Sequence, residues 1–224
     1  MLSFSLGKIP VTVHLPFIFM GVILGTSLGN DIPVLAMWLA ILFVSVMAHE
    51  LGHAFAGIAF GLTPRIDLHG MGGTTSWRHK DVSTAKKIAI SLAGPAVGIF
   101  FGGILYLLQP SLMQSEISRM ARIAVILLIE VNLYWGALNL LPMMPLDGGN
   151  AMAHGLGAVM GEKGMTLAHY ISLVVALAAG LFAWSFGYGW WPVLLAGMFA
   201  FQNIRAVMPA QKQPPRPPVV PQQW

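Results

Sequence analysis

The residues His49, Glu50 and His53 combine two imidazoles and a carboxylate at a spacing that suits metal chemistry. On an α-helix, side chains four residues apart lie on one face, so His49 and His53 can bind the same metal ion with Glu50 beside them. This H-E-x-x-H pattern predicts a zinc site with an adjacent general base. The pattern lies in a strongly apolar stretch, where ionisable side chains are costly. That cost favours a functional site over accidental burial of polar groups.

A third protein ligand must come from elsewhere in the chain, because a catalytic zinc site usually has three protein ligands and one water. The chain contains no cysteine, so His, Asp or Glu must supply this ligand. The ionisable candidates outside obvious loops are Glu130, Asp147, His154 and His169. Asp147 stands out because the prolines and glycines of residues 142–149 oppose regular helix and can fix a carboxylate on an extended segment.

The composition is that of a membrane protein. Hydrophobic residues make up 56% of the 224 positions and charged residues only 9%, whereas soluble domains contain about 25% charged residues. No polar block large enough to fold separately interrupts the apolar segments, so residues 1–208 are predicted to form one membrane-embedded domain. Residues 209–224 are rich in proline and are predicted to form a disordered cytoplasmic tail. A net charge of +4 from few, scattered basic residues argues against a nucleic-acid partner.

The predicted fold class is an all-α polytopic membrane protein with about six transmembrane helices. Apolar runs and their helix-breaking ends place these spans at residues 15–29, 33–60, 83–108, 118–141, 166–186 and 190–207, with a short helix at 151–160. From Pro33 to His49 is about 24 Å of helix, in a hydrocarbon layer about 30 Å thick. The metal is therefore expected within the membrane, nearer the C-terminal end of the second helix.

Between the second and third spans the pattern changes to strand formers and glycines. Residues 61–81 predict a short β-ribbon or re-entrant segment, with an ordinary polar loop as the alternative at this point. An unpaired strand edge at membrane depth could pair with an extended peptide. We therefore take Gly70, Gly72, Gly73 and Thr74 as candidate substrate-binding residues.

The distribution of Lys and Arg predicts the orientation in the membrane. With a cytoplasmic N-terminus, only Arg119 and Arg122 of the 12 basic residues lie outside. Both termini are therefore expected in the cytoplasm, with the metal site toward the same side, in a multi-pass protein of a prokaryotic cell membrane. The second and fourth helices then run in the same direction, so His53 and Asp147 reach a similar depth.

The chain resembles the site-2 protease family of intramembrane zinc metalloproteases. The resemblance rests on residues 48–53 (A-H-E-L-G-H), on residues 139–149 (N-L-L-P-M-M-P-L-D-G-G) and on the Gly94-Pro95 helix between them. It covers residues 10–207. H-E-x-x-H alone is moderately specific, because soluble zinc proteases share it, whereas its pairing with the second pattern is strong.

The resemblance implies His49, His53 and Asp147 as the ligands of one Zn²⁺ ion. It also implies Glu50 as the catalytic base and Asn139 near the substrate or the oxyanion. The compact six-span form of the family is expected, with no PDZ-like insertion between the motifs and no nucleotide-binding regulatory domain after the last span.

The predicted function is intramembrane proteolysis of a transmembrane protein substrate, cut within or near its membrane segment. Zinc would supply a Lewis acid and an acidified water, and Glu50 would carry the proton. The substrate helix must unwind before it is cut, and the predicted ribbon around Gly70–Thr75 is the candidate for holding the unwound strand. The lipid bilayer and the transmembrane substrate are the expected partners.

Alternative functions predict other features. A membrane metal transporter or sensor needs further ligand sets along a path, at which only Glu130 hints. A non-cleaving binder of transmembrane segments would not need every catalytic residue type, yet all are present. A membrane zinc protease that trims prenylated peptides needs a third ligand from a Glu on a later helix. Glu116, Glu130 and Glu162 have no fitting motif around them.

Overall fold

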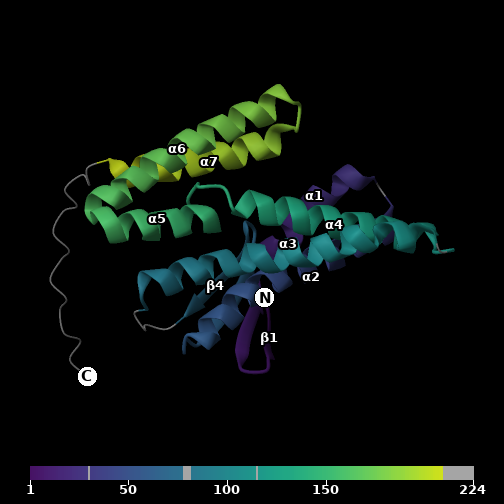
Figure 1. Cartoon of the computed structure of the whole chain (residues 1–224). Coiled ribbons are helices and arrows are strands. Elements are labelled where there is room, and N and C mark those ends of the chain that lie inside the picture. Colours follow the sequence, from purple (N-terminus) through teal and green to yellow (C-terminus); the bar gives the residue numbers. More distant parts are fainter. Residues whose placement is uncertain (30, 78–81, 115, 209–224) are drawn as a thin grey trace, which may run out of the picture.

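The computed structural model describes residues 1–29, 31–77, 82–114 and 116–208 (Figure 1). The predicted tail at residues 209–224 lies outside the described residues. The strands are β1 (Leu2–Leu6), β2 (Ile9–Val13), β3 (Pro64–His69) and β4 (Gly72–Trp77). The helices are α1 (Leu15–Gly25), α2 (Ile32–Ala59), α3 (Thr84–Gln114), α4 (Arg119–Asn139), α5 (Asp147–Met160), α6 (Glu162–Ser185) and α7 (Trp190–Val207), with a short 3-10 helix at Thr26–Leu28 after α1.

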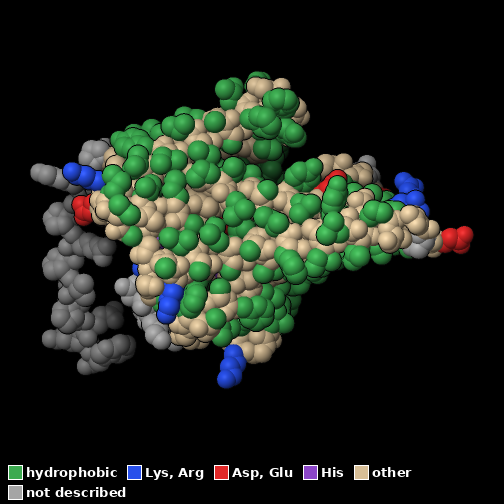
Figure 2. All heavy atoms as spheres, in the orientation of Figure 1, with side chains coloured by type: hydrophobic (Ala, Val, Ile, Leu, Met, Phe, Trp, Pro, Cys, Tyr) green, Lys and Arg blue, Asp and Glu red, His purple; other side chains and the backbone are tan. Residues whose placement is uncertain are grey.

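Within the described residues, four helices are long and apolar enough to cross a membrane, namely α2, α3, α4 and α6. Helix α1 has 11 residues and is about 16 Å long, which is shorter than the hydrocarbon layer. Helix α7 has 18 residues, but Gln202, Asn203 and Arg205 make it less apolar. The predicted count of six spans therefore stays a prediction. Figure 2 shows hydrophobic side chains spread over the whole visible face and few charged side chains, most of them near its edges.

The predicted ribbon between the second and third helices is confirmed as the antiparallel pair β3–β4. It is half of a four-stranded sheet with the order β1-β2-β3-β4, in which β2 and β3 pair in parallel. The all-α fold class was therefore incomplete. In the parallel pair, Val11 lies opposite Ile66. These strands are far apart in the sequence, so local sequence patterns do not predict that they pair.

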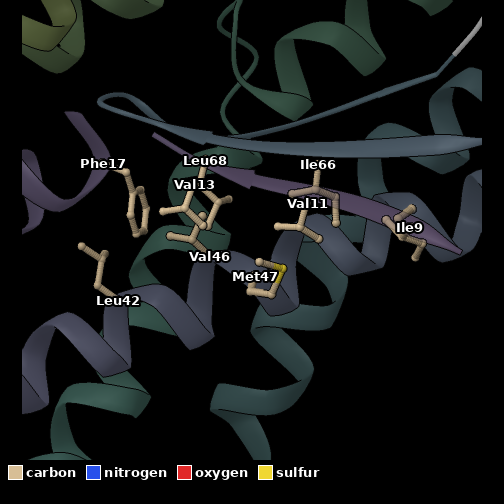
Figure 3. Close-up of a cluster of buried hydrophobic side chains, with 10 residues drawn as sticks. Ile9, Val11, Val13, Phe17, Leu42, Val46, Met47, Ile66 and Leu68 are labelled. Carbon is tan, nitrogen blue, oxygen red and sulfur yellow. The ribbon is translucent and has the colours of Figure 1, made fainter. Parts of the chain in front are cut away.

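One face of the sheet packs on α2. Figure 3 shows apolar side chains of β2 and β3 pointing toward the side chains of α2. The buried cluster contains Ile9, Val11, Val13, Phe17, Leu42, Val46, Met47, Ala54, Ile66 and Leu68. Side chains of a strand alternate between its two faces, which explains why Val11 and Val13, or Ile66 and Leu68, point the same way. This packing holds the sheet against the part of α2 that carries the H-E-x-x-H residues.

Helix α3 runs past its predicted end at residue 108 to Gln114, with Pro95 and Pro110 inside it. The prediction treated the Pro110 region as a helix end because proline removes a backbone hydrogen bond and crowds the preceding turn. Membrane helices tolerate internal proline where neighbouring helices and side chains satisfy the freed backbone groups. Helix α4 packs on α3 and α2, α5 packs on α3 and α6, and α6 packs on α7.

Candidate active site

Three ligand atoms meet at one point between α2 and α5. His49 Nε2 lies 3.0 Å from Asp147 Oδ2, His53 Nε2 lies 3.3 Å from the same oxygen, and the two Nε2 atoms are 3.2 Å apart. Ligand atoms placed 2.0–2.1 Å from a tetrahedral zinc ion are about 3.3 Å from one another. The two imidazoles and the carboxylate therefore fit the donor type and spacing of a zinc site, and both histidines are buried.

A hydrogen bond fixes the tautomer of His53. Its Nδ1 donates to the backbone oxygen of Ile90 at 2.7 Å, which leaves Nε2 with a lone pair directed at the ligand cluster. Gly94 lies against this ring, and a Cβ atom there would collide with the imidazole. A Cβ on Gly52 would lie only 2.7 Å from the backbone oxygen of Ala93. Helices α2 and α3 can thus approach closely enough to hold His53 because both positions are glycine.

The carboxylate of Glu50 is buried beside the two histidines and faces β4. Thr75 Oγ1 lies 2.7 Å from Glu50 Oε2 and also 3.0 Å from the Glu50 backbone oxygen. A Cβ on Gly73 would lie 2.5 Å from Glu50 Oε1. Gly73 and Thr75 share one face of the strand, so strand alternation brings both against Glu50. The sequence placed Thr75 only at the end of the candidate ribbon, and its contact with Glu50 was not predicted, although strand alternation could have pointed to this contact once Gly73 was placed at the site.

Asp147 is the first residue of α5, with Leu146 as the N-cap. The prediction of an extended segment at Asp147, with a helix only from residue 151, was therefore wrong, because the non-helical backbone ends at Leu146 and α5 begins four residues earlier than predicted. Gly148 and Gly149 let α5 begin against the preceding segment, since a Cβ on either would collide with the backbone between residues 140 and 144.

The ligand cluster opens into a cavity of about 540 Å³. Beside the cluster, its wall includes Asn139, which is 8% exposed and donates from Nδ2 to the Trp135 backbone oxygen at 2.9 Å. Two of the predicted substrate-binding residues, Gly73 and Thr74, also line it. The remaining wall is formed by His69, Met71, Thr75, Trp77, Ile90, Ser91, Trp135, Leu138, Pro145, Leu146, Asn150, His154, Leu195, Phe199 and Gln202.

The structure separates the other two ribbon glycines from this wall. A Cβ on Gly70 would lie 3.3 Å from the Pro16 side chain of α1, and one on Gly72 would lie 3.3 Å from the Trp135 indole. Gly72 has a φ of +117°, a value that other residues rarely adopt. Glycine is therefore favoured at these two positions by the turn between β3 and β4 and by the close packing of this turn on Pro16 and Trp135.

The other candidates for a third ligand lie outside the cluster. His154 follows Asp147 by two turns of α5 and lines the cavity, where burial and then the positive charge of Lys87 lower the pKa of its imidazole. His169 of α6 pairs with Asn203 of α7 at 2.9 Å. Glu130 lies on an exposed face of α4.

Comparison with known proteins gives relatives in sequence and in structure. The chain is 32% identical over 162 residues to the zinc metalloprotease MJ0392 of Methanocaldococcus jannaschii, a match that covers 71% of this chain and 45% of that relative. The chain therefore spans less than half the length of this relative. It is 31% identical over 204 residues to the "Putative zinc metalloprotease Rip2" of Mycobacterium tuberculosis, with 76% of each chain covered. No protein-family model matches the chain.

One structural relative is the site-2 protease from Methanocaldococcus jannaschii. The two structures superpose with a TM-score of 0.64 at 25% sequence identity, over 95% of this chain and 99% of the other. The likeness therefore extends over the helices and the sheet together, beyond the metal-binding residues.

Proposed function

Because this chain belongs to the site-2 protease family of zinc metalloproteases, we propose that it hydrolyses peptide bonds of membrane proteins within or near their transmembrane segments. The observation that carries the proposal is the meeting of His49, His53 and Asp147 at 3.0–3.3 Å with Glu50 beside them. Three ligands and a neighbouring carboxylate are the parts of a hydrolytic zinc site. The zinc ion would be held by the two Nε2 atoms and by Asp147 Oδ2.

Zinc bound there would polarise a peptide carbonyl and make a water molecule a stronger acid. Glu50 is the residue placed to accept the proton of that water and to deliver it to the leaving amine. The Thr75 hydroxyl lies 2.7 Å from one carboxylate oxygen of Glu50, and a carboxylate oxygen of Glu50 lies within 4.8 Å of a ring nitrogen of each histidine. Asn139 keeps its amide oxygen and a second amide hydrogen for the substrate backbone or the oxyanion, because its bond to Trp135 uses only one hydrogen.

The substrate would enter the cavity as an extended strand beside β4. Strand β4 is at the edge of the sheet, so one side of its backbone is not paired with another strand of the sheet. A peptide added to such an edge as a strand forms backbone hydrogen bonds with it. Unpaired backbone N–H and C=O groups of an unwound peptide would otherwise be costly in a membrane. Gly73 and Thr74 would then contact the substrate directly, while Gly70 and Gly72 would shape the turn that leads into β4.

The proposed setting is a cell membrane crossed six times, with both termini and the active site on the cytoplasmic side. The four apolar helices support the membrane setting, and the charge distribution supports the orientation. Within the described residues, one group of three or more potential ligands comes together, at His49, Glu50 and His53. A transport path for metal would be expected to show a series of such groups, so this finding favours the protease over the transporter.

The test uses the full-length protein in liposomes with a single-span substrate protein. The proposal predicts cleavage that a zinc chelator stops and that added zinc restores, with mass spectrometry locating the cut in or next to the substrate's membrane segment. Zinc-dependent transport without cleavage of any single-span substrate would refute the protease assignment.

A further inference from the structure

We propose that two buried polar residues of the last helices, Ser172 on α6 and Asn203 on α7, are positioning residues for the metal ligand Asp147. The inference rests on the zinc site of the proposed function and extends it to residues outside the ligand motifs. Ser172 is 0% exposed and Asn203 is 2% exposed. A polar side chain buried in a membrane helix is costly unless it is hydrogen-bonded, so the partners of these two residues indicate what they do.

Both residues bind the backbone of Met144, three positions before Asp147. The Met144 N–H donates to Ser172 Oγ at 2.9 Å, and Asn203 Nδ2 donates to the Met144 backbone oxygen at 2.7 Å. The Ser172 hydroxyl donates in turn to the Ala168 backbone oxygen at 2.8 Å, and Asn203 Nδ2 also donates to that of Phe199 at 2.8 Å. Met144, in the α4–α5 connection, is thus bound at its backbone N–H by α6 and at its backbone oxygen by α7.

His169 fixes the orientation of the Asn203 amide. Asn203 Oδ1 can only accept a hydrogen bond, so His169 Nδ1 donates to it across 2.9 Å. This bond directs the Nδ2 group of Asn203 toward Met144. His169, a candidate ligand from the sequence, therefore acts on the site indirectly, through Asn203 and the backbone of Met144.

The segment between Met144 and Asp147 can transmit this restraint. The Leu146 N–H donates to the Met143 backbone oxygen at 2.9 Å, which closes a tight turn just before Asp147. The Met143 side chain is buried in a cluster with Phe199 of α7. Figure 1 shows the connection from α4 to α5 running toward α6 and α7 before α5 begins. A displacement of Met144 would therefore shift Asp147 relative to the two histidines.

The test compares zinc affinity, by chelator competition, for the full-length wild type, Ser172→Ala and Asn203→Leu. We expect the zinc dissociation constant to rise about tenfold or more in each variant, the lower range seen when residues that orient metal ligands are removed. The control is Ala183→Gly, which weakens packing at another buried position of α6. Its zinc affinity should match wild type. Ser172→Ala is the smaller change. If the Asn203→Leu protein does not accumulate in cells, the zinc affinity of Ser172→Ala still tests the proposal.

A spectroscopic readout separates positioning from general destabilisation. The visible spectrum of the cobalt(II)-loaded protein depends on ligand geometry, so it should change in Ser172→Ala and stay unchanged in Ala183→Gly. His169→Leu should weaken zinc binding less than Asn203→Leu, and the double variant should be no weaker than Asn203→Leu alone, because His169 acts through Asn203.

Asp147→Ala distinguishes failure of this inference from failure of the proposed function. If Asp147→Ala loses zinc affinity while Ser172→Ala and Asn203→Leu bind zinc like wild type, the positioning role is refuted and the zinc site stands. If Asp147→Ala itself binds zinc like wild type, the third-ligand assignment is refuted, and the positioning role falls with it.

Discussion

Thr75 Oγ1 lies 2.7 Å from Glu50 Oε2, so a strand of the sheet holds the carboxylate that α2 carries next to the two histidines. The sheet and the helices are thereby joined at the chemical centre as well as through the apolar cluster of Figure 3. This contact gives the sheet two roles, since β4 orients the proposed base and also presents the edge proposed to receive the substrate.

Thr75→Val should reduce the turnover number about tenfold while the zinc content stays at that of wild type. The substitution preserves the shape of the side chain but removes a hydrogen bond to a carboxylate, which contributes about 1.5–3 kcal/mol. Cleavage kinetics together with metal analysis check this expectation. Ser76→Ala is the control, because Ser76 lies on the other face of β4 and is exposed. Equal loss of activity in both variants would contradict a specific role for Thr75.

Gly94→Ala should abolish tight zinc binding because the added methyl group would occupy the space of the His53 ring. Gly103→Ala on the same helix is the matched control, since a Cβ there meets no atom within 4 Å. Alanine also favours helix over glycine by about 1 kcal/mol, so the control should fold at least as well as wild type. The measurement is the zinc content of the two purified variants, which should be lost in Gly94→Ala and unchanged in Gly103→Ala. Wild-type zinc content in Gly94→Ala would show that His53 does not need this space.

The residues of the proposed metal site could be singled out in the sequence because their patterns are local. His49, Glu50 and His53 share one helical segment, and Asp147 stands in an unusual run of proline and glycine. The structure brings these side chains close together, and their roles as ligands and base stay predictions. Local patterns also predicted the β3–β4 hairpin and the positions of the long helices.

What could not be predicted depends on contacts between distant segments. The pairing of β2 with β3 joins strands on either side of α1 and α2. The contact of Thr75 with Glu50 requires that the sheet be placed on α2 first. Ser172 and Asn203 occur in apolar helices with no motif around them, and only their bonds to Met144 reveal a role. The end of α3 was missed because neighbouring helices change how strongly proline ends a helix.

Thr74→Cys should crosslink to substrate if β4 holds the unwound strand. Thr74 lines the cavity and lies on the edge strand, whereas Arg65 lies on β3, which is paired on both sides. A substrate with cysteines near its cleavage site, trapped in a Glu50→Gln background, should form disulfides with Thr74→Cys and far fewer with Arg65→Cys. Equal yields at the two positions would argue against strand addition at β4.

The proposed orientation predicts which ends of the helices meet the cytoplasm. Lys163→Cys at the start of α6 and Arg205→Cys near the end of α7 should react with a membrane-impermeant thiol reagent only from the cytoplasmic side. Arg119→Cys at the start of α4 should react only from the outside. The chain has no native cysteine, so each variant reports one position. Labelling of Arg119→Cys from the cytoplasm would overturn the orientation.

The most direct test of the account measures zinc content and substrate cleavage together in Glu50→Gln and Asp147→Ala. Glu50 is assigned to proton transfer and Asp147 to metal binding, so the loss of cleavage and the loss of zinc should separate. Glu50→Gln should retain about one zinc ion per chain and lose cleavage by at least about a hundredfold, because proton transfer by a positioned side chain contributes about 10²–10⁴ in rate. Asp147→Ala should lose both zinc and cleavage. Wild-type cleavage by Glu50→Gln, or full zinc content in Asp147→Ala, would contradict the account.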